Sequence, residues 1–491
     1  MMSSVRKRHL RKTFMKKPLI SVLLVTIALI YSNSAVSRTA DSNDSARSQL
    51  MANQPTEAGE VLAKWRQLTE NDDLSFSTYA GFLISYPNFP LTQRLRFYAE
   101  NALIESQAPS ELLLAFFAVH PPITNTGRAR YALALMSSDE AAAKNLAVEA
   151  WQGGTMLESV KRALLSAFGQ NFNTQNHEKR MEALLWQEKA DLASEHLDQV
   201  SSERRRIYEK RIALLGDGQV SGQVLETLES ELHYPGVVYN LVRYYRRNNQ
   251  IENATRVLTN RPTFSQLPFE AADLVSEMLI VAKRANSHQA TQIAYSVDDL
   301  FPEGTDISKG SFRLRDKYTD LMWLGGTTSL WNHGNSARAA PLFYRYGAAA
   351  RTPLTRAKGF YWAGICFQQA GDSEQANHYL EMGARYPDQY YGQLALRAMN
   401  RAMPQFSQLP DTEISDAERS SFRSRPLVKI VQEIALNRTD WPTERRFFEA
   451  LAESADTTSK MQMLVELSQE LLLDEFAVVA ALNAAENNLS G

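Results

Sequence analysis

The sequence predicts an all-α protein built as an α-α superhelix of antiparallel helical hairpins. Glycine is sparse, with 22 residues in 491, whereas alanine, leucine, glutamate and glutamine are common. These residue types favour helices, and the alternation of apolar and polar residues that marks strands is almost absent. Glycine, proline and N-capping residues separate the helical segments at irregular intervals. This spacing favours hairpins of unequal length over a regular solenoid.

The first 37 residues have the pattern of a Sec-type secretory signal. Seven lysines and arginines lie between Arg6 and Lys17, an apolar run extends from Pro18 to Tyr31, and a small-residue cleavage site ends at Ser37. A retained membrane anchor is the alternative, but the run is shorter than the ~20 residues that span a bilayer. No cysteine lies nearby, which argues against a lipoprotein. We expect export, cleavage and a flexible polar lead over residues 38–54.

The charge of the exported chain argues against nucleic acid as a partner. Removing the seven basic residues of the signal leaves 46 Lys and Arg against 55 Asp and Glu, a net charge of −9. Such a surface attracts neither nucleic acid nor anionic membranes, so no membrane contact is expected after cleavage. Cys366 is the only cysteine. Its apolar neighbours predict a buried free thiol rather than a nucleophile.

Two helices in the first half of the chain have clear boundaries. Pro109-Ser110 opens an apolar helix that Pro121-Pro122 closes. Ser137 and Glu140 have the spacing of a capping box, before a helix that ends at Gly153-Gly154.

The segment from Arg356 to Ala398 predicts two antiparallel helices with tetratricopeptide-like spacing and then a third helix. Gly371-Asp372 separates the first two helices, and Asp372 with Gln375 predicts an N-cap. Gly364 and Ala376 are small residues that let the facing helices approach. Pro387 ends the second helix, and the third opens on Tyr390-Tyr391-Gly392.

These boundaries predict three regions after the lead. Residues 55–402 form the superhelical domain, residues 403–421 a polar connector, and residues 422–491 a C-terminal helical subdomain. In the last region four apolar residues recur on one helical face: Met463, Leu464, Leu467 and Leu471. Phe447, Phe448 and Trp441 are expected to pack within this subdomain.

The sequence YWAG, AGD, YP and YYGQLAL, in this order between Tyr361 and Leu396, resembles the end of the superhelical domain of the soluble lytic murein transglycosylases. These bacterial enzymes cleave peptidoglycan. Four earlier segments resemble the alphaproteobacterial branch of the same family in order and spacing: FFAVHPP with GRARYA (116–132), AVEAWQGG (147–154), HEKRMEALLW (177–186) and VVYNLVRYYRRNNQIENATRVL (237–258). The resemblance implies a U-shaped or ring-like superhelix in the periplasm, with peptidoglycan glycan strands as partners.

The resemblance supplies no catalytic residue. Family members carry a lysozyme-like domain after the superhelix, with a Glu-Ser pair and a later Gly-Leu-Met-Gln or Gly-Met-Met-Gln run. Here the Glu-Ser pairs lack any such run, and they are expected to be solvated helix positions: Glu105-Ser106, Glu158-Ser159, Glu229-Ser230 and Glu453-Ser454. We therefore expect this chain to be inactive alone. A truncated gene, a fragment and a stand-alone binding protein all fit a chain ending at Gly491.

No metal or cofactor site is predicted. The eight histidines form no HExxH or similar pattern: His9, His120, His177, His196, His233, His288, His333 and His378. The phosphate-loop, Rossmann and GxSxG motifs are absent. Two basic clusters fit either carboxylates of peptidoglycan stem peptides or a solvated helix face: Arg204-Arg205-Arg206 with Lys210 and Arg211, and Arg243, Arg246 and Arg247. Tyr390 and Tyr391 are expected to pack in the core rather than stack on sugars.

The sequence therefore predicts the non-catalytic superhelical scaffold of a periplasmic lytic transglycosylase. In the family, the enzyme cleaves the bond between N-acetylmuramic acid and N-acetylglucosamine. One glutamate acts first as acid and then as base, and a 1,6-anhydro product forms without water. The alternative is a periplasmic tetratricopeptide-like adaptor that binds other envelope proteins.

Overall fold

The computed structural model describes residues 43–103, 108–216, 218–404 and 413–486, and within these ranges the chain is helical and contains no strand. The all-α prediction is therefore confirmed. The α-helices of the first half are α2 Ala58–Glu70, α3 Phe76–Ser85, α4 Thr92–Asn101, α5 Ser110–Phe117, α6 Asn125–Leu135, α7 Glu140–Gln152, α8 Glu158–Phe168, α9 Thr174–Trp186, α10 Ala190–His196, α11 Ser202–Ala213, α12 Gly222–Glu229 and α13 Pro235–Arg247. Those of the second half are α14 Ile251–Asn260, α15 Ala271–Ala282, α16 Ser287–Tyr295, α17 Phe312–Thr327, α18 Ser336–Ala349, α19 Pro353–Gln369, α20 Ser373–Ala384, α21 Tyr390–Ala398, α22 Asp416–Ser424, α23 Pro426–Asn437, α24 Trp441–Glu453, α25 Thr458–Glu470 and α26 Asp474–Glu486. A π-helical turn, η5 Thr328–Asn332, continues α17.

Polar residues at the helix starts satisfy the first backbone N–H groups, which explains many of the boundaries. The Asp372 side chain accepts from the Gln375 N–H at 3.0 Å, as the sequence predicted. The expected Ser137 capping box is wrong. The cap of α7 is Asp139, whose carboxylate accepts from the Ala142 N–H at 2.9 Å. Asp139 lies one residue before the helix, where its side chain reaches the free N–H groups.

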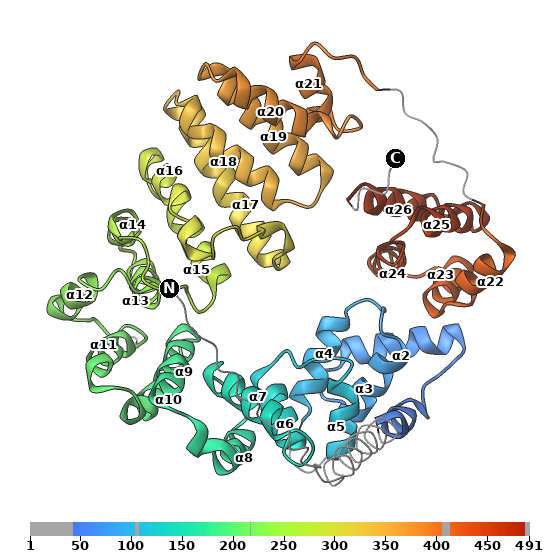
Figure 1. Cartoon of the computed structure of the whole chain (residues 1–491), viewed down its shortest axis with the longest axis horizontal. Helices are drawn as coiled ribbons and strands as arrows, with labels where there is room; N and C mark the ends of the chain where they lie inside the picture. The colour runs from blue at the N-terminus through green and yellow to red at the C-terminus, as the bar shows by residue number, and fades with distance from the viewer. Residues whose placement is uncertain (1–42, 104–107, 217, 405–412, 487–491) are drawn as a thin grey trace, which may run out of the picture.

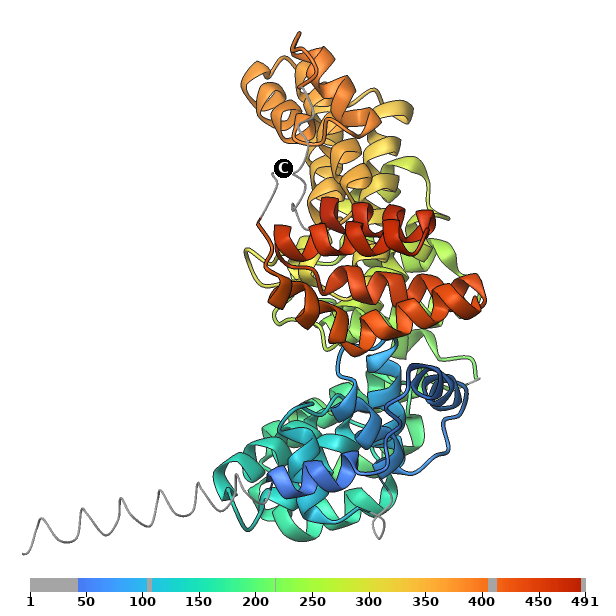
Figure 2. The same ribbon diagram turned by 90° about the vertical axis from the view of Figure 1, so that its right-hand side faces the viewer.

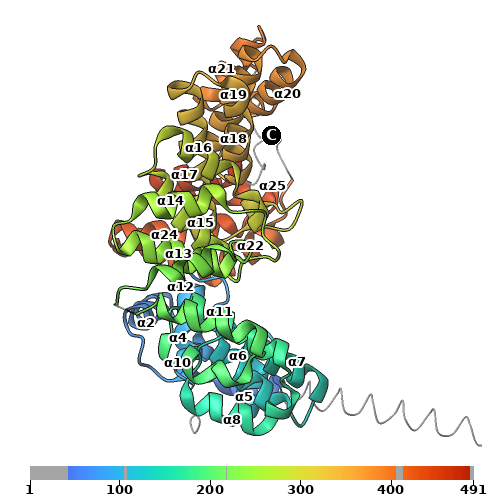
Figure 3. The ribbon, with the colours of Figure 1, turned by 90° about the vertical axis from the view of Figure 1, so that its left-hand side faces the viewer.

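The helices follow one another around a ring (Figure 1). Between α7 and α16 the hairpins alternate, with α7, α9, α13 and α15 toward the centre and α8, α10, α12, α14 and α16 outside. Figure 2 shows the C-terminal helices α22–α26 directly above the N-terminal helices, and Figure 3 shows the stack of α11–α15 on the opposite side. The superhelix thus curves until its two ends meet.

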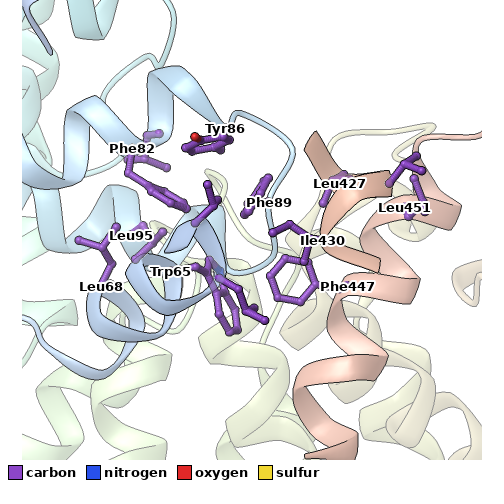
Figure 4. Close-up of a cluster of buried hydrophobic side chains, with 14 of the residues drawn as sticks. Trp65, Leu68, Phe82, Tyr86, Phe89, Leu95, Leu427, Ile430, Phe447 and Leu451 are labelled. Carbon is purple, nitrogen blue, oxygen red and sulfur yellow. The ribbon is translucent and has the colours of Figure 1, made fainter. Parts of the chain in front are cut away.

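One hydrophobic core joins the two ends of the chain. It contains buried residues from positions 46–134 together with buried residues from positions 422–480. The Phe447 ring of α24 lies edge-on to Trp65 of α2, at 4.9 Å between centroids, and edge-on to Phe89, at 5.6 Å. Figure 4 shows these rings where the blue and red ribbons meet. The expectation that Phe447 packs only within its own subdomain is therefore too narrow, since Phe447 closes the ring.

The hairpin of α19 and α20 depends on small residues at its contact. A Cβ atom on Gly364 would lie 2.7 Å from the Leu380 Cγ and 3.1 Å from the Ala376 carbonyl oxygen. Ala376 is 3% exposed, and Cys366 is fully buried in the same region. Gly364 and Ala376, the small residues predicted to let the two helices approach, thus lie at the contact between α19 and α20.

The structure differs from the sequence-based expectation at two segments. Residues 43–51, placed within the flexible lead, form a helix that buries Ala46 and Leu50 in the core shared by the two chain ends. Helix α22 begins at Asp416, inside the expected connector, because Ser415 and Glu418 form a capping box there. The signal sequence at 1–37 lies outside the described residues. No helix within the described ranges has the length and apolar character to cross a membrane.

Candidate functional site

A cavity of about 1070 Å³ opens where the ends of several helices meet, from the end of α4 to the start of α15. Its walls come from the first turns of α6 and α13, the segments that follow α7 and α9, and the loop that precedes α15. We call this cavity the hairpin groove. Because it draws on segments spread over residues 97–270, it forms only after the hairpins have stacked.

Side-chain amides fix the floor of the hairpin groove. Asn125 Nδ2 donates to the carbonyl oxygens of Gly153 and Thr155, at 2.5 and 3.1 Å. Gln187 Nε2 donates to the Gly153 oxygen at 2.9 Å, and its Oε1 accepts from the Thr155 N–H at 3.0 Å. A Cβ on Gly153 would lie 2.0 Å from Asn125 Oδ1, so a larger residue here would displace the Asn125 side chain from the floor. The Gly153-Gly154 helix end predicted from the sequence is thus part of this floor.

The rim of the hairpin groove is apolar and accessible. Four large apolar side chains that line it are 40–51% exposed: Phe97, Leu157, Leu267 and Phe269. Accessible apolar side chains gathered around one concavity are typical of binding surfaces. Sequence analysis missed this rim because its four members come from three segments far apart along the chain.

The first basic cluster is divided between structural and exposed roles. Arg211 is 1% exposed and donates from Nη1 to both carboxylate oxygens of Glu182, at 2.7 and 2.8 Å. Its Nε donates to Asn240 Oδ1 at 2.9 Å, which ties α11 to α9 and α13. Arg205 instead pairs with Asp198 and Glu209 at the surface. The structure therefore does not bring these residues together as one carboxylate-binding patch.

The second basic cluster is also paired within the protein. Arg243 and Arg246 both donate to Glu277, which is 3% exposed, at 2.7–3.0 Å. Glu188 pairs with Arg243 and with Arg247. A buried carboxylate held by two guanidinium groups is a structural arrangement, because the loss of either partner leaves a buried charge.

Glu158 and Glu229 are paired with cations rather than held in an apolar pocket like the catalytic acid of a glycosidase. Glu158 lies in the first turn of α8 and pairs with Lys161 at 2.7 Å. Glu229 accepts from both Nη atoms of Arg256 and from the Tyr245 hydroxyl. The Arg256 hydrogen bonds lower the pKa of Glu229, the opposite of what a catalytic acid requires. Glu105 lies outside the described residues.

The paired tyrosines at the start of α21 differ from expectation. Tyr390 is 64% exposed, whereas Tyr391 is half-buried against Tyr361 at 5.6 Å between ring centroids. A Cβ on Gly392 would lie 1.8 Å from the Tyr386 carbonyl oxygen, so glycine is required where α21 turns back on the chain. The first turn of α21 therefore leaves the Tyr390 ring in solvent, and the prediction of core packing is wrong for this residue.

His177, His196 and Cys366 have packing roles. His177 and His196 lie 5.2 Å apart beside Trp151, and burial lowers the pKa of His196 to about 4. Burial raises the pKa of the Cys366 thiol to about 12, so this cysteine is unreactive at neutral pH. Among the described residues, no group of three or more His, Cys, Asp and Glu side chains is placed to hold a metal ion.

Comparison with known proteins gives structural likenesses only. No family model matches the chain, and no curated protein matches it. One solved structure, the 70-kDa soluble lytic transglycosylase in complex with bulgecin A, is similar over 94% of this chain and 71% of its own, with 15% identity and a TM-score of 0.47. The structure of the 70-kDa enzyme from Escherichia coli is similar over 93% of this chain and 70% of its own, with 15% identity and a TM-score of 0.45. The structure of an inactive mutant of the lytic transglycosylase from Pseudomonas aeruginosa is similar over 90% of this chain and 67% of its own, with 15% identity and a TM-score of 0.48.

Proposed function

We propose that this chain is the superhelical, non-catalytic scaffold of a periplasmic lytic transglycosylase and that it binds peptidoglycan glycan strands. The observation that carries the proposal is the closed ring, in which Phe447 packs against Trp65 and Phe89. A closed ring holds its binding surfaces at fixed positions, and remote contacts of this kind can orient a long polymer for chemistry performed elsewhere. The Gly364 contact supports the proposal, because it lies in the segment that carries the family resemblance.

Export to the periplasm is part of this proposal. It is supported by the basic and apolar pattern of residues 1–37, and the expected processing would start the mature chain near Arg38. Intact mass of the protein from the envelope fraction measures this directly. A chain that begins at Met1 in the cytoplasmic fraction would contradict the compartment, whereas Met1 retained at the membrane would contradict only cleavage.

The binding function is tested by sedimentation with insoluble peptidoglycan sacculi. We expect the purified chain to sediment with sacculi and to remain in solution with cellulose, a β-1,4-linked polymer without N-acetyl groups or peptides. Mass spectrometry of the supernatant should detect no 1,6-anhydro-muropeptides, because Glu158 and Glu229 lack the environment of a catalytic acid. A chain that stays in solution with both polymers would contradict the proposal.

A second candidate function is a protein-binding adaptor in the same compartment. The apolar rim of the hairpin groove favours it, because exposed apolar side chains such as Leu267 and Phe269 suit a peptide or a helix. Cross-linking in the envelope fraction separates the two functions. An adaptor should form one defined cross-linked protein adduct and should not sediment with sacculi. A glycan scaffold should sediment with sacculi and form no defined protein adduct.

A further inference from the structure

Five aromatic side chains form a continuous strip across η5, α19 and α21. In spatial order they are Trp331, Trp362, Tyr361, Tyr391 and Tyr390, and the steps between ring centroids are 5.7, 5.6, 5.6 and 5.3 Å. We call these residues the aromatic strip. Figure 1 shows its helices in the yellow and orange arm of the ring, away from the hairpin groove.

The aromatic strip is exposed at its two ends and half-buried between them. Trp331 and Tyr390, at its two ends, are 60% and 64% exposed, and the three rings between them are half-buried. In α19, Phe360, Ala363 and Gly364 are buried, whereas Tyr361 and Trp362 are half-buried, and Trp362 also packs against Phe343 at 6.1 Å between ring centroids. Contiguous apolar patches on a protein surface mark binding sites, and the two exposed rings are joined through the three half-buried ones.

Lys358 is the cation beside the aromatic strip. Its Nζ lies 3.5 Å from the centroid of Trp323 and 5.7 Å from that of Tyr346, and Trp323 in turn lies 6.3 Å from Trp331. No carboxylate of the described chain pairs with Lys358, unlike Arg211 or Arg243. A half-buried ammonium group held by aromatic faces is positioned to meet an anion that the protein does not itself supply.

We propose that the aromatic strip binds a linear polysaccharide that carries carboxylate groups, with its sugar rings on the aromatic faces and one carboxylate at Lys358. This inference rests on the proposed glycan-binding function and assigns its site. Successive rings of the strip meet at 89°, 70°, 44° and 76°, so they offer differently tilted faces to an extended chain whose units have an apolar face and polar edges. The hydroxyls of Tyr361, Tyr390 and Tyr391 can bond those edges.

The charge of the chain selects this occupant over nucleic acid. Nucleic acid also stacks on aromatic rings, but its binding needs several cations along the backbone. Lys358 lies beside the aromatic strip, over Trp323, and the exported chain carries a net charge of −9, which disfavours a polymer with a charge on every unit. A ligand with sparse carboxylates complements this arrangement better than one with a charge on every unit.

Isothermal titration calorimetry with soluble, uncross-linked peptidoglycan strands tests the proposal on the full chain. The strip variant combines Trp331→Ala with Tyr390→Ala, which are exposed positions and so leave the core intact. Trp441→Ala is the matched control, because this tryptophan is 44% exposed and lies on α24, outside the strip. We expect the strip variant to weaken binding about tenfold or more and the control to bind like wild type. Circular dichroism confirms that both variants are folded.

The outcomes separate this inference from the function on which it rests. If wild type binds the strands and the strip variant binds equally well, the aromatic strip is not the site, although the proposed function stands. If wild type does not bind strands at all, both are overturned. If the strip variant keeps strand binding and loses a protein partner cross-linked in the envelope, the strip is a protein interface and the proposal is wrong.

The role of Lys358 is tested by amidating the carboxylates of the same strands. We expect amidation to weaken binding to wild type and to Lys358→Arg, and to leave the already weakened binding of Lys358→Met unchanged. Equal sensitivity of Lys358→Met and wild type to amidation would overturn the assignment of a carboxylate to this lysine.

Discussion

Truncation of Phe447 to alanine should open the ring. The Phe447 side chain is fully buried and lies edge-on to Trp65 and to Phe89, at 4.9 and 5.6 Å. Loss of a buried phenylalanine costs about 3–5 kcal/mol of folding free energy. Each edge-to-face pair contributes about 0.5–1.5 kcal/mol beyond its area. Both pairs cross from α24 to the N-terminal helices, so about 1–3 kcal/mol of the loss falls on ring closure itself.

Phe448→Ala is the matched control for this truncation. Phe448 is also fully buried, but its ring neighbours are Phe476, at 5.0 Å, and Trp441, both within the C-terminal helices. The two variants lose the same volume and should lower the melting temperature comparably. Only Phe447→Ala should separate the two ends of the chain.

The separation can be measured by electron–electron distance spectroscopy between spin labels at Glu60→Cys in α2 and Arg445→Cys in α24. Cys366 does not compete for the label, because it is buried and its pKa is raised to about 12. We expect a longer and broader distance distribution for Phe447→Ala than for Phe448→Ala. An unchanged distribution for Phe447→Ala, or equal broadening for both, would refute the assignment of closure to this ring cluster.

Three further changes test the interior of the superhelix. Gly364→Leu should cost about 1–3 kcal/mol or more through overpacking at the α20 contact, whereas the exposed Glu374→Ala should stay within about 0.5 kcal/mol; thermal melts compare them. Arg211→Ala should lower the free energy of unfolding by about 3–5 kcal/mol, because it leaves Glu182 without its buried partner. The double variant with Glu182→Gln should regain part of this stability in urea denaturation. Because the folded pKa of Glu229 is lowered, its ionised form stabilises the fold above the unfolded pKa of about 4.3, and this stabilisation is lost as pH falls through the folded pKa. Glu229→Gln should therefore lower the free energy of unfolding at pH 7. Denaturation curves of this variant should show a smaller loss of stability between pH 5 and 3 than those of wild type.

The parts of the structure that depend on local contacts were predictable from the sequence. The α19–α20 hairpin is an example, since Gly364 meets a helix only a few residues away along the chain, and Asp372 caps the helix that follows it. The helix at residues 43–51 was missed because its segment is polar apart from Ala46, Leu50 and Met51, and it is stabilised by a core formed elsewhere.

The long-range parts could not be predicted in the same way. Ring closure through Trp65 and Phe447 joins residues that each look like ordinary core positions in their own helices. The hairpin groove and the aromatic strip likewise collect residues from separate helices. The pairs Tyr361-Trp362 and Tyr390-Tyr391 are visible in the sequence, but their contact across α19 and α21 is not. The exposure of Tyr390 depends on how α21 packs rather than on its sequence alone.

Closure of the ring also places a constraint on biosynthesis. The N-terminal segments bury Trp65 and Phe89 against Phe447 of α24, which leaves the ribosome only after the intervening helices have been made. Until then this apolar face has no native partner, and contacts between such distant residues form late and slowly. Nascent or interrupted chains that lack α24 should therefore be recognised by holdase chaperones and cleaved by proteases at their N-terminal helices.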